Sequence, residues 1–180
     1  MLVALSQNVY ADSISGDIDL KNSKLDTMNV SGSASFQNMH FKSLDVSGSL
    51  NFENLTITEA LHVSGAAKGK ILKCKSLDVS GTFNGEDITI NGKTVISGEL
   101  NTKNSSFQDI EIKSSKSTLK NSTAHNIIVQ PTTDKPQKLI LKGSTIISGD
   151  VVFQSGDGEV HIGSKARIKG HVKGAKIINN

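Results

Sequence analysis

Two aspartates are the first candidates for acid–base chemistry. Asp45 and Asp78 occupy the same place in two copies of the heptapeptide Lys-Ser-Leu-Asp-Val-Ser-Gly, at 42–48 and 75–81. If each repeat forms one coil, the two carboxylates lie two coils apart, on the order of 10 Å. A carboxylate pair at that distance suits an inverting glycosidase. Because both belong to copies of one repeat, repetition explains them better than catalysis does, and we predict no catalytic residue.

Histidine and cysteine offer the next candidates. The histidines are His40, His62, His125, His161 and His171, and their intervals do not follow the repeat. His161 and His171 could approach each other, but no acidic or cysteine partner stands at the spacing of metal ligands. The one cysteine, Cys74, occupies an inward position and is expected to behave as a small apolar residue. We therefore expect no metal site, no cofactor and no enzymatic activity.

Basic residues gather near the end of the sequence. The possible anion-binding stripe consists of Lys165, Arg167, Lys169 and Lys173, which alternate with apolar residues and should point outward. Such a stripe suits an anionic polysaccharide or another envelope component. Nucleic acid is not expected, because aromatic residues that would stack on bases are absent from the stripe. The alternative is an ordinary solvated face that protects a terminal strand edge.

A Ser-Gly repeat shows which elements must position these residues. Its glycines are Gly16, Gly32, Gly48, Gly65, Gly81 and Gly98, in steps of 16 or 17. After each glycine, apolar residues favour offsets +2 and +4, +7 and +9, and +12 and +14. A spacing of two is the strand period, so each unit predicts three short strands. The pattern predicts an all-β, single-stranded parallel β-helix (β-solenoid), three-sided, with about 16–17 residues per coil.

Asparagine marks a second corner of the repeat. At offset +6 stand Asn22, Asn38, Asn54, Asp87, Asn104 and Asn121, with Ile71 as the exception. Stacked coils would place these side chains above one another, where each amide can bond its neighbour. We predict a structural ladder along this corner and not a row of ligands.

The domain boundaries follow from where the pattern lapses. Residues 12–180 are predicted to form the β-helix, with an inserted loop at 130–138 that contains both prolines, Pro131 and Pro136. A bulge is expected at 66–70. Residues 1–11 resemble the end of a secretory signal peptide, with Val9 and Ala11 before the cleavage position. The alternative for residues 1–11 is an apolar capping strand. No apolar stretch of the sequence approaches the length of a transmembrane helix.

The stretch Val160-His161-Ile162-Gly163-Ser164-Lys165-Ala166-Arg167-Ile168-Lys169-Gly170-His171-Val172-Lys173-Gly174 resembles the bactofilins, bacterial β-helix proteins that polymerise. The resemblance covers the end of the chain, from Val151 onward, and implies a right-handed triangular helix that stacks end to end. Bactofilins lie in the cytoplasm or face the inner membrane, so the resemblance also implies a cytoplasmic location as the alternative to export.

These observations together predict a non-enzymatic scaffold. No helix with capping signals appears near either terminus, so head-to-tail association with further copies is expected. The signal-like residues predict an extracytoplasmic location, in the periplasm, at the cell surface or secreted. A surface adhesin or carbohydrate-binding module is the second hypothesis, and a polysaccharide-active enzyme is the third.

Overall fold

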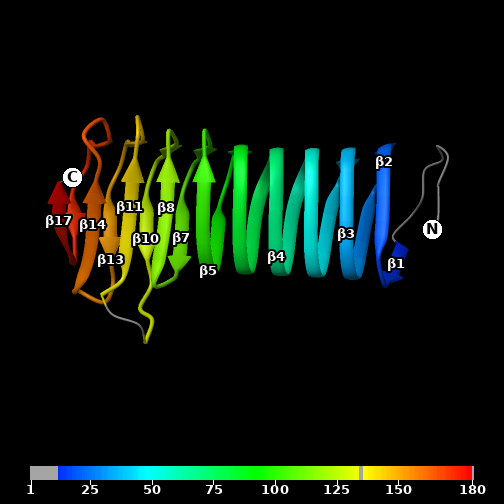
Figure 1. Cartoon of the computed structure of the whole chain (residues 1–180), viewed down its shortest axis with the longest axis horizontal. Coiled ribbons are helices and arrows are strands. Elements are labelled where there is room, and N and C mark those ends of the chain that lie inside the picture. Colours follow the sequence, from blue (N-terminus) through cyan, green and yellow to red (C-terminus); the bar gives the residue numbers. More distant parts are fainter. Residues whose placement is uncertain (1–11, 134–135, 180) are drawn as a thin grey trace.

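Parallel strands wind around one axis to form a β-solenoid of about 10 turns. This computed structural model describes residues 12–133 and 136–179, and within them there is no helix. The predicted signal-peptide residues 1–11 lie outside the described residues. Strands β1 and β17 lie at opposite ends of a straight rod (Figure 1). The predicted all-β parallel solenoid is therefore confirmed.

Seventeen strands form the described chain. In order they are β1 Asp12–Ser15, β2 Ile18–Lys24, β3 Thr27–Phe41, β4 Ser43–Ile90, β5 Thr94–Lys103, β6 Ser106–Phe107, β7 Ile110–Lys113, β8 Lys116–Lys120, β9 Thr123–Ala124, β10 Ile127–Val129, β11 Lys138–Lys142, β12 Ile146–Ile147, β13 Val151–Phe153, β14 Gly158–Ile162, β15 Arg167–Ile168, β16 Val172–Lys173 and β17 Ala175–Asn179. Strand β4 is long because its ladder continues around the corners of several coils.

The rod has three faces, which are clearest in its C-terminal half. There each strand pairs with the strand three places further along the chain. One face contains β7, β10, β13 and β16, the second contains β8, β11, β14 and β17, and the third contains β6, β9, β12 and β15. The right-handed sense stays a prediction.

Coil length differs between the two halves of the rod. Met28 pairs with Leu44 and Ile110 with Ile127, so the coils of the regular half have the length that the Ser-Gly repeat predicts. Ile127 then pairs with Val151, and Val151 with Val172, so each of the later coils is several residues longer. The longer coils carry their extra residues at corners, where no ladder bond has to be kept.

The largest such insertion lies between β10 and β11. Val129 pairs with Ile112 and Lys138 with Lys116, so residues 130–137 replace residues 113–115 of the preceding coil. Lys138, the last residue of the predicted loop, is already the first of β11. Gln137 fastens the segment, because its Nε2 donates to the carbonyl oxygens of Ser114 and Gln130 at 2.9 and 2.7 Å.

The Ser-Gly corner is a column of stacked glycines. Its six glycines have φ between 108° and 142°, a region that L residues rarely adopt. A Cβ on Gly65 would lie 2.1 Å from the carbonyl oxygen of Gly48 in the coil before. Both the backbone angle and the close approach of consecutive coils therefore require glycine at this corner.

The asparagine corner also turns through positive φ. All seven residues at that offset have φ between 50° and 59°, Ile71 and Asp87 included. Asn38 Nδ2 donates to Asn22 Oδ1 at 2.9 Å, and Asn121 Nδ2 donates to Asn104 Oδ1 at 3.4 Å. Asparagine tolerates this conformation better than other residues with a Cβ, which is why it recurs here. In the next coil Gly143, with φ 58°, takes the same corner.

The core is a narrow apolar column. At residues 66–70, where the inward side chains are small, two phenylalanines from neighbouring coils keep it filled. Strand β4 runs through this segment without interruption, so the expected bulge is wrong. Gly69 and Ala67 leave space in one coil, and the rings of Phe52 and Phe83 occupy it from the coils on either side, stacked with centroids 6.5 Å apart. A large side chain thus offsets a small one in the neighbouring coil, which keeps the interior close-packed.

Candidate functional site

The two aspartates lie on an open face of the rod with a histidine between them. Gly48, Gly65 and Gly81 stack directly, so Asp45, His62 and Asp78, each three positions before one of them, share one outward column. His62 Nδ1 lies 3.8 Å from Asp78 Oδ2, and about half of each side chain is exposed. Sequence reasoning named His62 but did not place it in this column, although it stands one repeat after Asp45 and one repeat before Asp78. An exposed pair of this kind contributes little stability.

His161 and His171, the two histidines that could approach each other, bind different partners. His161 Nε2 lies 3.0 Å from Glu159 Oε2, and His171 Nδ1 lies 3.5 Å from Asp150 Oδ1. Among the described residues, no group of three histidine, cysteine or acidic side chains is placed to hold a metal ion.

Cys74 is a buried core residue. Its thiol donates to the carbonyl oxygen of Ser76 at 3.3 Å, and burial raises the pKa of the thiol to about 12. A thiol that stays protonated at neutral pH is a poor nucleophile and a poor ligand.

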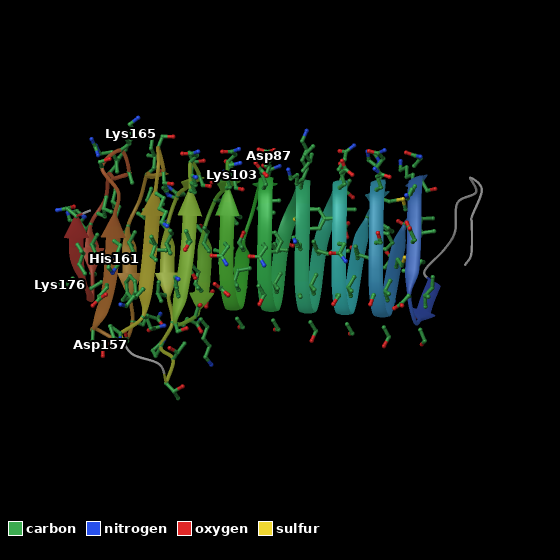
Figure 2. The ribbon with its side chains drawn as sticks, in the orientation of Figure 1. Asp87, Lys103, Asp157, His161, Lys165 and Lys176 are labelled. Atoms are coloured by element: carbon green, nitrogen blue, oxygen red, sulfur yellow. The ribbon has the colours of Figure 1, made fainter. Side chains whose placement is uncertain are left out.

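The four residues of the predicted basic stripe are exposed but do not share one face. Lys165 lies between β14 and β15 at the upper edge of the rod (Figure 2), Arg167 begins β15, and Lys173 ends β16 on another face. Arg167 Nη1 donates to the carbonyl oxygens of Ser164 and Ala166, and Lys173 Nζ lies 3.4 Å from Asp150 Oδ2. Lys169 follows β15. The stripe is thus distributed around the end of the rod.

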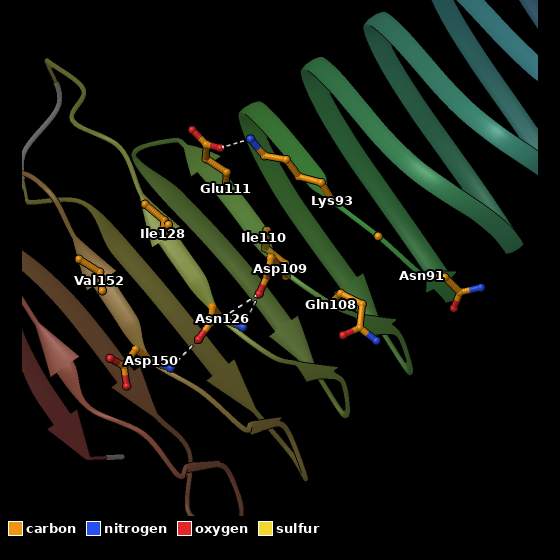
Figure 3. A pocket seen from close by; sticks show the side chains of 11 residues that line it. Asn91, Lys93, Gln108, Asp109, Ile110, Glu111, Asn126, Ile128, Asp150 and Val152 are labelled. Carbon is orange, nitrogen blue, oxygen red and sulfur yellow. Dashed lines mark hydrogen bonds and ion pairs between the residues drawn. The ribbon is translucent and has the colours of Figure 1, made fainter.

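A cleft of about 650 Å³ lies on the face that contains β7, β10 and β13 (Figure 3). Its acidic groups are already bonded within the protein. Asn126 Nδ2 donates to Asp109 Oδ1 at 2.9 Å, Asn126 Oδ1 accepts from the Asp150 backbone N–H at 2.9 Å, and Lys93 Nζ lies 2.6 Å from Glu111 Oε2. Ile128 is 38 % exposed beside them. This arrangement is a lateral polar ladder that joins three coils.

A dense cluster of cations covers the second face, over β5, β8 and β11. We call it the lysine face and define it by Lys103, Lys116, Lys120, Lys138 and Lys142. Lys103, Lys120 and Lys142 are in register in consecutive coils, and Lys116 pairs with Lys138 beside them. All five are exposed, and Figure 2 shows Lys103 next to Asp87 at the asparagine corner.

Acidic residues stand at both ends of the lysine face. Glu86 Oε2 lies 3.2 Å from Lys70 Nζ, and Glu86 also bonds Lys103. The hydrogen bond from Lys103, followed by that from Lys70, lowers the pKa of Glu86, and the same bond raises the pKa of Lys103. At the other end Lys138 Nζ lies 3.3 Å from Glu159 Oε2, and a hydrogen bond from His161 is the main cause of a lowered Glu159 pKa. Within the described residues, the ammonium groups of Lys116, Lys120 and Lys142 form no ion pair.

A shallow groove of about 460 Å³ runs along the rod beside the lysines, and we call it the axial groove. Asn84, Asn101 and Thr118 are in register along it and are partly buried. Its lining extends over β4, β5, β8 and β11 and consists of Lys68, Gly69, Lys70, Asn84, Gly85, Glu86, Asn101, Thr102, Lys103, Thr118, Lys120 and Lys142.

The sequence held part of the signal for this site. Lys103 and Lys120 are one repeat apart and share an offset from the repeat. The interval from Lys120 to Lys142 is longer than one repeat, because the 130–137 segment intervenes. The place of Lys142 in the same column therefore required the register of β11.

Comparisons with other proteins add no relative. No protein-family model, curated protein or solved structure matches this chain, so the solenoid and its lysine face are described from geometry alone. Within the part of the chain that the structure describes, no helix is long and apolar enough to cross a membrane.

Proposed function

We propose that this protein is a non-enzymatic rod-shaped scaffold that binds an anionic polymer along its lysine face. The observation that carries the proposal is the register of Lys103, Lys120 and Lys142, with Lys116 and Lys138 beside them. Strand spacing places successive lysines about 4.8 Å apart along the rod. A linear partner that lies along the axis can therefore contact several cations at once.

Like charges directly opposite each other destabilise a sheet. Lys116, Lys120 and Lys142 form no ion pair among the described residues, so solvent and salt must screen most of their mutual repulsion. A bound polyanion supplies the missing opposite charges, and its affinity should fall as the salt concentration rises.

The frame supports a scaffold role because it resists local distortion. Glycine and asparagine columns hold successive coils in register, and the core fills the interior between them. The Asp45–His62–Asp78 column lies on an exposed strand face and forms no water-excluding cavity, which favours a surface ion pair over a catalytic site. Head-to-tail association and the extracytoplasmic location stay predictions, and electron microscopy of the purified chain tests the first.

The binding proposal is tested by chromatography on immobilised heparin, a generic polyanion. We expect the wild-type rod to be retained and the triple variant Lys116→Ala, Lys120→Ala, Lys142→Ala to elute at clearly lower salt. The matched control removes three exposed cations of the predicted stripe, Lys165→Ala, Lys169→Ala and Lys173→Ala, and should elute close to wild type. Equal elution of wild type and the lysine-face variant, with both folded by circular dichroism, would refute the proposal.

A further inference from the structure

Asn84, Asn101 and Thr118 form the floor of the axial groove, and they add hydrogen-bond donors and acceptors to the positive charges of the lysines. Asn101 Nδ2 donates to Asn84 Oδ1 at 3.1 Å. This bond leaves Asn101 Oδ1 as an acceptor and Asn84 Nδ2 as a donor, and neither atom forms another hydrogen bond within the described residues. Thr118, in register with Asn101, adds a hydroxyl that both donates and accepts.

Donors and acceptors side by side match a ligand that carries hydroxyl groups. A hydroxyl needs a partner for its proton as well as for its lone pairs, and the groove floor provides both. A phosphate polymer offers acceptors almost alone, so the side-chain carbonyl oxygen of Asn101 would face negative oxygens without a proton between them. The floor therefore selects against a simple polyphosphate, although the lysines alone would accept one.

The repeat of the site also distinguishes between polymers. The coils of Lys103 and Lys120 each contribute one lysine to the row and one polar residue to the floor, with a rise of about 4.8 Å. The coil of Lys142 continues the lysine row but places Ile140 at the floor position. That rise is close to the length of one sugar unit in an extended glycan. The phosphates of each strand of duplex DNA repeat at about 3.4 Å along the helix axis. No aromatic side chain lines the groove for bases to stack on.

Resting on the proposed function, we infer that the polymer is a linear polysaccharide with a carboxylate on each sugar, bound in the axial groove parallel to the rod. Its carboxylates lie against the row Lys103, Lys120 and Lys142. Its hydroxyls bond the floor residues Asn84, Asn101 and Thr118. Glu86, which precedes Lys103 in the same column, limits the length of glycan that gains from binding at one end of the row.

Calorimetric titration with polygalacturonate tests this inference, with a length series of its oligomers, inorganic polyphosphate and fully methyl-esterified polygalacturonate as comparison ligands. We expect binding of the charged glycan to strengthen with oligomer length and then level off, and we expect the esterified polymer not to bind. The floor variant Asn101→Ala, Thr118→Val should weaken glycan binding about tenfold and leave polyphosphate binding unchanged. The lysine-face triple variant should weaken both.

The outcomes separate the two proposals. If polyphosphate binds as tightly as the glycan and the floor variant changes neither, the glycan assignment is wrong and the polyanion-binding function stands. If wild type binds no polyanion at all, both are wrong. Because Asn101 and Thr118 are only partly buried and lie on the outer face of the sheet, the floor variant should fold, and circular dichroism verifies it.

Discussion

Asn54 Nδ2 donates a hydrogen bond of 2.9 Å to Oδ1 of Asn38, the residue at the same corner one coil earlier. The next residue at this corner is Ile71, which adopts φ 58° and is 41 % exposed. Isoleucine cannot continue the amide ladder, and its branched Cβ is costly in the left-handed region. The amide ladder therefore stops at Asn54 and resumes between Asn104 and Asn121, in the middle of the regular half.

We expect Ile71→Asn to stabilise the rod by about 1 kcal/mol, because asparagine relieves backbone strain and can bond Asn54. Urea denaturation monitored by circular dichroism measures the change. Ile71→Val is the control, since valine keeps the branched Cβ and should leave the midpoint almost unchanged. A loss of stability in Ile71→Asn would show that Ile71 makes apolar contacts worth more than the ladder.

At the stacked glycine corner, we expect the stability lost on adding one methyl group to depend on which glycine is replaced. Gly65→Ala places a Cβ about 2.1 Å from the Gly48 carbonyl oxygen, so the two coils must separate locally. We expect a loss of about 2–4 kcal/mol in the free energy of unfolding. Gly16→Ala shares the positive φ but meets nothing within 4 Å, and it should cost only about 1 kcal/mol. Equal losses in the two variants would mean that backbone angle alone fixes these glycines.

Thr94 brings a hydroxyl into the apolar column. It lies between Leu77 and Ile110 in register, is fully buried, and its Oγ1 has no hydrogen-bond partner among the described residues. Thr94→Val keeps the shape and removes the unpaired polar atom, so we expect a gain of about 1 kcal/mol. The matched variant Thr89→Val, at an outward position of β4, should change the unfolding free energy by less than about 0.5 kcal/mol.

The buried thiol of Cys74 should make the stability of the folded protein depend on pH in the alkaline range. Its thiol has a pKa of about 12 in the folded protein against an ordinary value of 9.0. Because the folded pKa is raised, the thiol's contribution to stability is complete below pH 9 and is lost as pH rises toward 12, where the unfolded chain releases the proton first. Cys74→Ala should lose this part of the pH profile.

Accessibility to reagents provides a second measurement on the same residue. The thiol should resist labelling by an aromatic disulfide reagent at about pH 8 in the folded rod and react promptly in urea. Rapid labelling of the native protein under these conditions would contradict the burial described for Cys74.

The fold was predictable because each coil repeats the same local chemistry. Ser-Gly and asparagine corners have characteristic backbone angles, and pairs of apolar residues two apart mark the strands between them. The expected bulge at 66–70 failed because the offset rule treats each coil alone. Phe52 and Phe83 fill the space above Gly69 from neighbouring coils, a compensation that only the stacked structure reveals.

The site was harder to predict than the fold. The repeat spacing is enough to place Lys103 and Lys120 in one column, but the sequence analysis did not single them out. Lys142 is outside the reach of spacing, because the length of the insertion is not fixed by the repeat. Alternation along the chain correctly makes Lys165, Arg167, Lys169 and Lys173 outward-facing, yet alternation does not say which face of a three-sided rod a residue occupies. Placement on a face depends on the number of residues at every preceding corner.

The segment between β10 and β11 has a consequence for how such a rod can change. Residues 130–137 take the place of a much shorter corner, while the strands on both sides keep their partners. Because the flanking strands keep their partners, we expect this corner to accept an inserted epitope or recognition peptide without a change in strand pairing. Changes at this corner would then alter which partner the edge of the rod binds, while Lys116 and Lys138 on the neighbouring strands stay in place.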